Sequence, residues 1–246
     1  MLGIHRHAFA VTALCGALLP WGVYSAEDVS ARGILVASHK ATLSTELAGK
    51  VISVPKKMGE SFRAGETLLA LDCRLFEAQT DKVAAEVQVA QIRLDNTKQL
   101  NQLRSIGTLE VAIAEAELAK VQAEHRIAKL NVERCKIKAP FAGFVEQLDI
   151  QNHEIVQQQQ PLITIVNKQQ LQADIIVPSD WMTWLEVGAA VQLMVEETGQ
   201  SLQGKLSHIG PSIDPTSQTL QLKAEVNNVP DKVLPGMSVV AQFVVK

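Results

Sequence analysis

Aromatic side chains are scarce in this sequence of 246 residues, where Phe, Trp and Tyr together make up 4%. A single large domain usually has more of these side chains in its core, so the composition favours a few small folded units. Positive charge is not in surplus either, since 23 Lys and Arg are set against 26 Asp and Glu. The chain therefore lacks the basic surface that a nucleic-acid-binding protein needs.

Signatures of catalysis are also missing. We find no nucleophile with a partner base at an interpretable spacing, no Gly-rich phosphate loop and no paired carboxylates, so the sequence predicts that the protein is not an enzyme. The histidines and methionines beyond the first 30 residues are scattered, and we expect neither a metal site nor a cofactor. They are His39, His125, His153, His208, Met58, Met182, Met194 and Met237.

A long apolar run occurs only at the start of the chain. Arg6 precedes the apolar residues 8–19, and small residues follow before Glu27. This order is typical of a secretory signal peptide, which we assign to residues 1–26, with cleavage near Ala26. A retained membrane anchor is the alternative, but the run is short for a helix that spans a bilayer. We expect a mature protein in an exported compartment.

Two segments of the chain, residues 49–71 and 143–165, repeat one pattern. Each copy has the features of short strands joined by tight turns, with turns assigned to Gly49 and Gly143. One unit of this size is too small to be stable alone, so we expect the copies to close a single β-sandwich. At an offset of 94 the matching pairs are Gly49 and Gly143, Val51 and Val145, Val54 and Leu148, Glu60 and Glu154, Phe62 and Val156, Leu68 and Leu162, Leu69 and Ile163, and Leu71 and Ile165.

Residues 72–135, between the two copies, are predicted to form an antiparallel helical hairpin. They contain no proline and a single glycine, Gly107, to which we assign the reversal between the arms. Apolar residues follow alternating steps of three and four in both arms, which is a coiled-coil pattern. The predicted seam consists of Phe76, Thr80, Val83, Val87, Ala90 and Leu94 in the first arm and of Leu109, Ile113, Ala116, Lys120, Ala123, Ile127 and Leu130 in the second.

The hairpin has a consequence for the two cysteines at its ends. Because it returns the chain to its starting point, the two sandwich copies can meet, and Cys73 comes near Cys135. We hypothesise a disulfide between them, since an exported compartment permits one. Two half-buried free thiols are the alternative.

The remainder of the chain, residues 167–246, changes to short alternating strands separated by Pro and Gly. Several such strands at regular spacing predict a small β-barrel. A short helix that carries Trp181 and Trp184 interrupts them. We expect this helix to plug one end of the barrel rather than to form a docking surface.

Five segments, taken in their order, carry a resemblance to a known family. They are RGILVASHKATLSTELAGKV at 32–51, LLALD at 68–72, ERCKIKAPFAGFV at 133–145, IDPTSQTLQLKAEV at 213–226 and VLPGMSVVAQF at 233–243. With them the chain resembles, over nearly its whole mature length, the periplasmic adaptor proteins, or membrane fusion proteins, of the HlyD and RND adaptor type. These proteins work in tripartite efflux and secretion systems.

The resemblance implies a mixed, mainly β architecture, with a split lipoyl-like β-sandwich, an α-helical coiled-coil hairpin and a β-barrel. The expected divisions are the signal peptide (1–26), an N-terminal segment that contributes to the barrel (27–48), the sandwich halves (49–71 and 136–166), the hairpin (72–135) and the barrel (167–246).

The resemblance also implies a function. Such a protein is the adaptor subunit of a multicomponent efflux pump in the periplasm, associated with the inner membrane. It links an inner-membrane transporter, of the RND or ABC type, to an outer-membrane channel protein for the export of small molecules. Adaptors of this family assemble side by side as homo-oligomers, often hexamers. The barrel faces the transporter and the hairpin tip faces the channel, which assigns channel docking to Leu103, Arg104, Ile106 and Leu109.

The sequence departs from the family pattern at two places. Many relatives of RND pumps carry a further membrane-proximal β-domain after the barrel, whereas this sequence stops at Lys246. We therefore expect transporter docking to involve the barrel and the sandwich. At the tip, Glu110 stands where the family commonly has serine, so the tip motif is not the conventional one.

Two other functions fit the same fold. The first is an envelope scaffold or a secretion-system tether that works without an efflux pump. The second is a lipoyl or biotin carrier, which needs a lysine on a short turn between the two half-motifs. That turn is replaced here by the hairpin, and Lys56 and Lys57 lie inside the first copy, so the carrier is the least favoured of the three.

Overall fold

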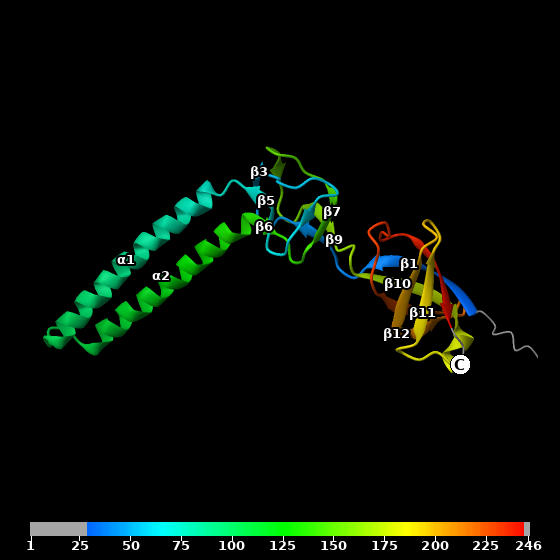
Figure 1. The fold of residues 1–246 in the computed structure, drawn as a ribbon. Helices are drawn as coiled ribbons and strands as arrows, with labels where there is room; N and C mark the ends of the chain where they lie inside the picture. Colours follow the sequence, from blue (N-terminus) through cyan, green and yellow to red (C-terminus); the bar gives the residue numbers. More distant parts are fainter. Residues whose placement is uncertain (1–28, 244–246) are drawn as a thin grey trace, which may run out of the picture.

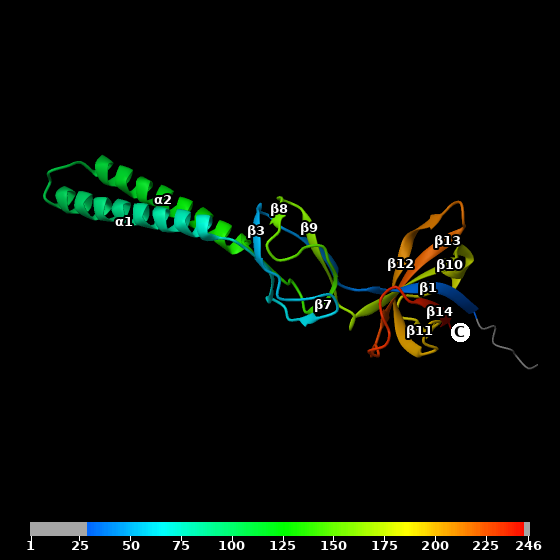
Figure 2. The same cartoon turned by 90° about the horizontal axis from the view of Figure 1, so that it is seen from above.

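The computed structural model describes residues 29–243 and consists of three units in a row (Figure 1). A helical rod, a β-sandwich and a closed β-barrel follow one another along the long axis, with the sandwich in the middle (Figure 2). The predicted signal peptide, residues 1–26, lies outside the described residues. Within residues 29–243, no helix combines the length and the apolar character that a membrane crossing requires.

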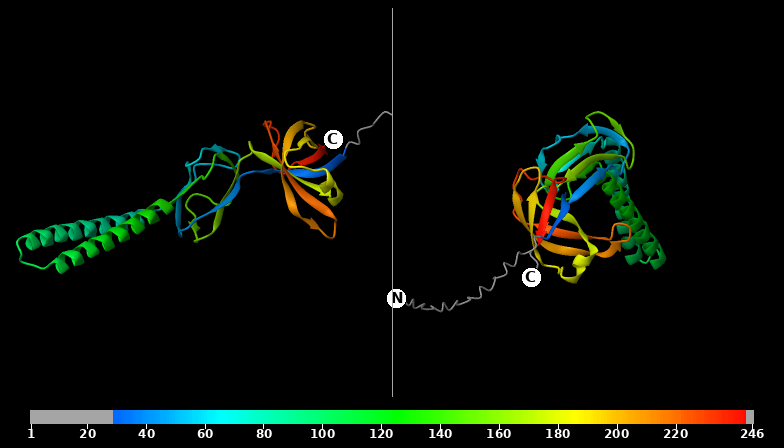
Figure 3. Two further views of the ribbon diagram at one scale, coloured as in Figure 1. Left: turned by 90° about the horizontal axis from the view of Figure 1, so that it is seen from below. Right: turned by 90° about the vertical axis from the view of Figure 1, so that its right-hand side faces the viewer.

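The barrel is a closed ring of six antiparallel strands, which Figure 3 shows end-on in its right-hand view. Along each strand alternate side chains point inward, as the period of two predicts. In the second strand of the ring, for example, Leu171, Ala173, Ile175 and Val177 are buried. The order around the ring is β1 (Val29–Ala37), β10 (Leu171–Pro178), β13 (Thr219–Val226), β12 (Ser201–Asp214), β11 (Ala190–Val195) and β14 (Ser238–Phe243).

One end of the barrel is covered by aromatic side chains. Trp181, in a 3-10 helix at Ser179–Thr183, and Trp184, just after it, both pack on Phe243 of β14, with ring centroids 5.8 and 6.2 Å apart. Both tryptophans are partly buried against the barrel core. This packing agrees with the plug that the sequence predicts.

The sandwich consists of two four-stranded sheets. One sheet has the order β2 (Lys40–Ser44), β9 (Pro161–Val166), β7 (Gly143–Leu148) and β4 (Ser61–Phe62). The other has the order β6 (Lys136–Lys138), β5 (Thr67–Leu71), β3 (Gly49–Ser53) and β8 (Ile155–Val156). At the offset of 94 the first order maps onto the second strand for strand. Each copy therefore supplies two central strands of one sheet and edge strands of the other.

The core of the sandwich follows the same repeat. Leu68 and Leu162 are both fully buried, and the pairs at 69 and 163 and at 71 and 165 are buried too. Backbone hydrogen bonds repeat as well, since Gly65 N donates to Ala139 O (2.8 Å) and Gln159 N donates to Thr45 O (2.7 Å). The prediction that two distant segments form one sandwich is confirmed.

The segment at 27–48 differs from its predicted role. Val29–Ala37 lies in the barrel as expected, but β2, Lys40–Ser44, pairs with β9 in the sandwich. The reason is the symmetry of the repeat, because β2 is the counterpart of β6 and completes the first sheet as β6 completes the second. The repeat begins earlier than residue 49, and the sandwich takes this strand from the segment that we assigned to the barrel.

The rod is an antiparallel pair of helices, α1 (Arg74–Gln102) and α2 (Thr108–Arg134). The apolar cluster between them consists of Val87, Ala90 and Leu94 from α1 and of Val111, Ala114, Leu118 and Val121 from α2. Lys98 Nζ also reaches Glu115 Oε1 across the pair, at 3.0 Å. The residues of α1 belong to the predicted seam, and so does Val83, which is also buried.

The predicted seam of the second arm is wrong. Leu109, Ile113, Ile127 and Leu130 are between 49% and 67% exposed, and the buried residues of α2 are Ala114, Leu118, Val121 and Ala128. The cause is that α2 carries two apolar stripes, each with steps of three and four. Periodicity cannot decide which stripe faces α1, and the structure turns the other one outward.

Candidate interaction surfaces

The tip of the rod is a tight turn between α1 and α2. Leu103 N donates to Gln99 O and Ser105 N donates to Leu100 O, at 3.1 and 3.0 Å, which closes the end of α1. The Asn101 side chain donates to Ile106 O at 3.0 Å and holds the far side of the turn. The two backbone bonds give partners to carbonyl groups in the last turn of α1, which would otherwise lack them.

Gly107 does not make the reversal, contrary to the prediction. Its φ of −82° is one that any residue adopts, and the left-handed residue of the turn is Arg104, with φ of +57°. A Cβ atom on Gly107 would lie 3.0 Å from the Glu110 carboxylate, which folds back toward the start of α2. An acidic group in the first turn suits the positive end of a helix dipole. The unusual Glu110 thus supports the helix start.

The four residues predicted for channel docking all lie at this tip. Leu103 is 74% exposed, Leu109 is also exposed, and Ile106 is half-buried. Arg104 presents its side chain from the left-handed position, also exposed. The structure therefore gathers apolar groups and one positive charge at the far end of the molecule.

A second surface runs along the outside of the rod. Exposed apolar side chains of the two helices are Val89, Ile92, Ile113, Ile127 and Leu130. Val89 also lines a hollow that Ala90 of α1 and Val121 of α2 share. Sequence reasoning found the α2 residues but assigned them to the seam, and it missed Val89 and Ile92. The sequence feature that could have revealed this surface is the presence of two apolar stripes on α2, of which only one can face α1.

A third surface lies on the wall of the barrel. Ile34 of β1 and Ile176 of β10 point outward and are 50% and 59% exposed, beside a hollow of about 400 Å³. The hollow is also lined by Arg32, Asp174 and Glu196. One oxygen of Asp174 is buried without a hydrogen bond, although Lys223 Nζ lies 3.5 Å away as an ion pair. Sequence reasoning missed this patch. It could have been found from the isoleucine that each of the two strands carries at an outward position.

The predicted turn glycines lie in strands instead. Gly143 is the first residue of β7, and a Cβ atom on it would collide with the backbone carbonyl of Val166 and approach Phe62 Cζ to 3.3 Å. Gly49 opens β3, where a Cβ atom would make only ordinary contacts with Leu71, at 3.8 Å. Gly143 is therefore needed for the close approach of two strands, whereas Gly49 has room for a side chain.

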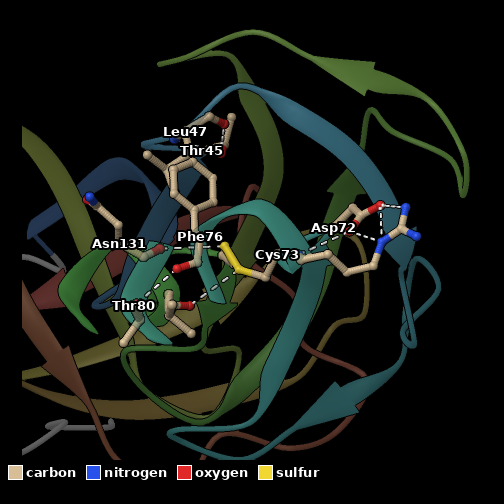
Figure 4. Close-up of a disulfide and its surroundings, with 10 residues drawn as sticks. Thr45, Leu47, Asp72, Cys73, Phe76, Thr80 and Asn131 are labelled. Atoms are coloured by element: carbon tan, nitrogen blue, oxygen red, sulfur yellow. Dashed lines mark hydrogen bonds and ion pairs between the residues drawn. A yellow bond between two sulfur atoms is a disulfide. The ribbon is translucent and has the colours of Figure 1, made fainter. Parts of the chain in front are cut away.

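The two cysteines at the foot of the rod are joined as a disulfide, with Cα atoms 6.0 Å apart (Figure 4). Beside it, Asp72 pairs with Arg74, whose Nη2 lies 2.6 Å from Oδ2. The side-chain and backbone hydrogen bonds from Arg74 lower the pKa of the Asp72 carboxyl to about 2. These groups mark the joint between the rod and the sandwich.

Lys56 and Lys57, the lysines considered for a carrier function, differ in their contacts and exposure. Lys56 Nζ is held by Glu66 Oε1 at 2.8 Å and donates to Ser61 O at 2.9 Å. This contact, with a backbone hydrogen bond from Arg63, lowers the pKa of the Glu66 carboxyl. Lys57 is exposed in the turn that Glu60 closes. No group of three or more His, Cys, Asp or Glu side chains suited to a metal occurs within residues 29–243.

Comparison with known proteins supports this architecture. Residues 171–246 match the family described as the CusB-like, beta-barrel domain. Nodulation protein NolF of Rhizobium meliloti (strain 1021) is 24% identical over 227 residues, and the toluene efflux pump periplasmic linker protein TtgD of Pseudomonas putida is 26% identical over 236 residues. The matches cover 86% and 83% of this chain but 62% of each relative. The chain thus spans less than two thirds of these proteins.

Solved structures share the fold at low identity. A chimeric MacA-MexA protein that contains the Pseudomonas aeruginosa MexA alpha-hairpin domain superposes with a TM-score of 0.77 at 17% identity, covering 89% of this chain and 81% of that one. The membrane fusion protein Spr0693 from Streptococcus pneumoniae R6 gives a TM-score of 0.75 at 16% identity, covering 89% and 99%. The predicted fold class and the resemblance to membrane fusion proteins are confirmed.

Proposed function

We propose that this protein is the periplasmic adaptor subunit of a multicomponent efflux pump. In this role it links an inner-membrane transporter of the RND or ABC type to an outer-membrane channel protein for the export of small molecules. The main support for this proposal is the linear arrangement of rod, sandwich and barrel. Exposed apolar side chains lie at both ends of this arrangement, Leu103 on the far tip and Ile34 and Ile176 on the barrel wall. The function is geometric, and no catalytic step is assigned to any side chain.

The names of two relatives support a role in efflux. TtgD is named a toluene efflux pump periplasmic linker protein, and a further relative in Pectobacterium atrosepticum is named multidrug resistance protein MdtA, at 24% identity. The family resemblance implies the direction of the link, in which the barrel wall contacts the transporter and the tip contacts the channel. We also place the mature protein in the periplasm, at the inner membrane, after cleavage of residues 1–26.

We further propose that copies of the chain associate side by side through the outer faces of the rod. Lys98 is level with Glu115 and Cys73 is level with Cys135, so the heights of the two helices can be matched. On this scale Val89 of α1 is roughly level with Ala123 of α2, and Ile127 of α2 with Ala85 of α1. When a second copy lies beside the first at the same height, α1 of one copy faces α2 of the other. Each large side chain, Val89 or Ile127, then meets a small one, Ala123 or Ala85. The number of copies that we propose is six, as the family resemblance implies.

Photo-crosslinking in intact cells tests the link. A photoreactive amino acid is placed at Leu103 on the tip, at Ile176 on the barrel wall and, as a control, at Gln122, which is exposed on the side of α2. Mass spectrometry of the products should identify an outer-membrane channel from Leu103 and an inner-membrane transporter from Ile176. Neither should be enriched from Gln122.

The outcomes separate the remaining functions. Products from Leu103 and Ile176 that contain only soluble or scaffold proteins would contradict the adaptor and favour an envelope tether. An intact mass that includes a lipoyl or biotinyl group on Lys57 would favour the carrier. Cells that lack the gene should accumulate the pump's cargo, and their transport should return with the wild-type chain.

A further inference from the structure

The joint between the rod and the sandwich is narrow. Within residues 29–243, two peptide connections cross it, one from Leu71 of β5 into α1 and the other from Arg134 of α2 into β6. The apolar cluster of the rod does not extend to the helix feet. It begins at Val87 of α1 and ends at Val121 of α2, and both residues lie more than ten positions from the feet. Near the foot, Val83 and Ala128 are the buried residues of the two helices. The two helix feet are therefore joined by the disulfide between Cys73 and Cys135 and by the backbone hydrogen bond from Leu71 N to Cys135 O, at 2.9 Å.

A small bracket on the sandwich receives the feet. It is the loop after β2, in which the buried Thr45 hydroxyl donates to Leu47 O at 2.6 Å and accepts from Leu47 N at 3.2 Å. Leu47 and Phe76, one turn into α1, both pack against the sandwich core together with Cys73 (Figure 4). On the other side, Arg134 Nε lies 2.9 Å from Glu46 Oε2.

These contacts differ in strength. The pair of Arg134 and Glu46 is exposed on both sides, and exposed ion pairs contribute little. Phe76 is partly buried and belongs to one helix only. The disulfide alone joins both feet covalently, so it fixes how α1 and α2 sit together on the bracket.

The disulfide can also be reached from solvent. A cavity of about 670 Å³ opens over it, and its lining includes Cys73, Cys135, Leu71, Val132, Lys50 and Lys136. Cys135 is almost completely buried, whereas Cys73 is partly exposed. Cys73 is thus the more accessible residue to a thiolate that enters the cavity, and attack on its sulfur makes Cys135 the leaving group.

We propose that the disulfide between Cys73 and Cys135 is a redox-sensitive clamp that sets the direction of the rod relative to the sandwich. In the oxidised form both feet sit on the bracket and the rod has one direction. A dithiol reductant attacks Cys73, the S–S bond breaks, and a mixed disulfide forms. The second thiol of the reductant then releases Cys73, so that the protein gains two thiols and the reductant becomes a disulfide. The rod then tilts on its two peptide connections, while rod and sandwich stay folded.

The inference does not depend on the proposed function, and it is tested on the purified exported protein. Spin labels are attached through a ketone-bearing amino acid at Met58 on the sandwich and at Gln99 near the tip, both exposed. Pulsed EPR then gives the distribution of distances between the labels. Addition of dithiothreitol should at least double the width of this distribution. A label pair at Gln88 and Gln122, one on each helix, should keep its distribution, because it reports on the rod alone.

Variants make the test specific. The double variant C73S/C135S should show the broad distribution without reductant and should not respond to dithiothreitol. Glu46→Gln should leave the oxidised protein unchanged, because its ion pair with Arg134 is exposed and contributes little. An unchanged width between Met58 and Gln99 after reduction would overturn the proposal, since packing alone would then fix the joint. Equal broadening of the rod pair, or free thiols in the unreduced protein by alkylation, would overturn it too.

Discussion

Gly59 and His153, which are 94 positions apart, have the same left-handed backbone conformation, with φ of +84° and +74°. Gly59 N donates to Val145 O at 2.8 Å, and His153 N donates to Val51 O at 2.9 Å. Each turn is therefore fastened to a strand of the other copy. The second copy adopts with a histidine the conformation that glycine adopts without strain, so the fold of the sandwich, and not the local residue, decides the shape of this turn.

The contrast between two strand glycines gives a first prediction. Gly143→Ala should lower the free energy of unfolding by about 1–3 kcal/mol, because the new methyl group collides with the Val166 carbonyl. Gly49→Ala is the matched control at the equivalent position, and it should be neutral or slightly stabilising, since its methyl group has room. Chemical denaturation of both variants measures the difference. Equal losses in the two variants would contradict the assignment of close strand packing to Gly143.

The disulfide predicts a large change in stability on reduction. It closes a loop with a sequence separation of 62, for which the chain-entropy model gives about 4 kcal/mol. Urea unfolding with and without reductant should show a loss of this order for the wild-type chain. The C73A/C135A variant should unfold identically in both conditions. A wild-type curve that reductant does not move would show that the thiols are free.

Acid should weaken the joint through Asp72. Its pKa is about 2 in the folded chain against an ordinary value of 3.8, so the ionised group stabilises the folded state above about pH 4, and this contribution is lost as the pH falls toward about 2. Asp72→Asn removes it, and the difference in thermal midpoint between wild type and variant should shrink over that range. Asp81→Asn, which removes a carboxyl group from the exposed side of α1, is the control. A constant difference for Asp72→Asn would contradict the shifted pKa.

Substitutions at the tip test channel docking, which depends on the proposed function. Leu103→Asp or Leu109→Asp should leave folding intact, because both side chains are exposed. Capture of the outer-membrane channel should fall by about tenfold or more, as for central apolar contacts of interfaces. Gln122→Asp adds the same charge away from the tip and should bind as the wild type does. Unchanged capture by both leucine variants would place the docking surface elsewhere.

The outer faces of the rod predict an effect on assembly. Ile127→Glu puts a charge where a second copy is proposed to pack, and it should shift the mass measured by light scattering from oligomer to monomer. Its helical content should stay that of the wild type, since Ile127 is exposed in the single chain. Gln122→Glu is the control. An oligomer that survives Ile127→Glu would assign assembly to the sandwich and the barrel.

Much of the fold could be predicted because the sequence contains a repeat. Pairs such as Leu68 and Leu162 are apolar in the sequence and buried in the structure, since the same position in each copy fills the same core. The repeat also explains why the rod is a hairpin, because the chain must return to the first copy before the second copy can pack against it. It did not reveal that Lys40–Ser44 belongs to the sandwich, because the sequence similarity of β2 and β6 is weak and only pairing identifies them.

The surfaces were harder to predict than the core. Ile113 and Ile127 have the spacing of a seam, and nothing in the local sequence shows that Leu118 and Val121 face α1 instead. The rotation of α2 is set by the turn at Arg104 and by the position of Cys135, which are tertiary features. Ile34 and Ile176 escaped notice for a similar reason, because one outward apolar residue per strand is visible as a patch only when the strands lie side by side.

The closing of the barrel between its first and last strands has a consequence for biosynthesis. Val29 of β1 pairs with Phe243 of β14. Along the sequence, the rod is inserted within the sandwich, and the sandwich is inserted within the barrel. A ribosome that makes the chain from its amino end completes the rod first, the sandwich next and the barrel last. Over four fifths of the polypeptide must be synthesised before the final neighbour of β1 exists, and until then this strand edge stays uncovered.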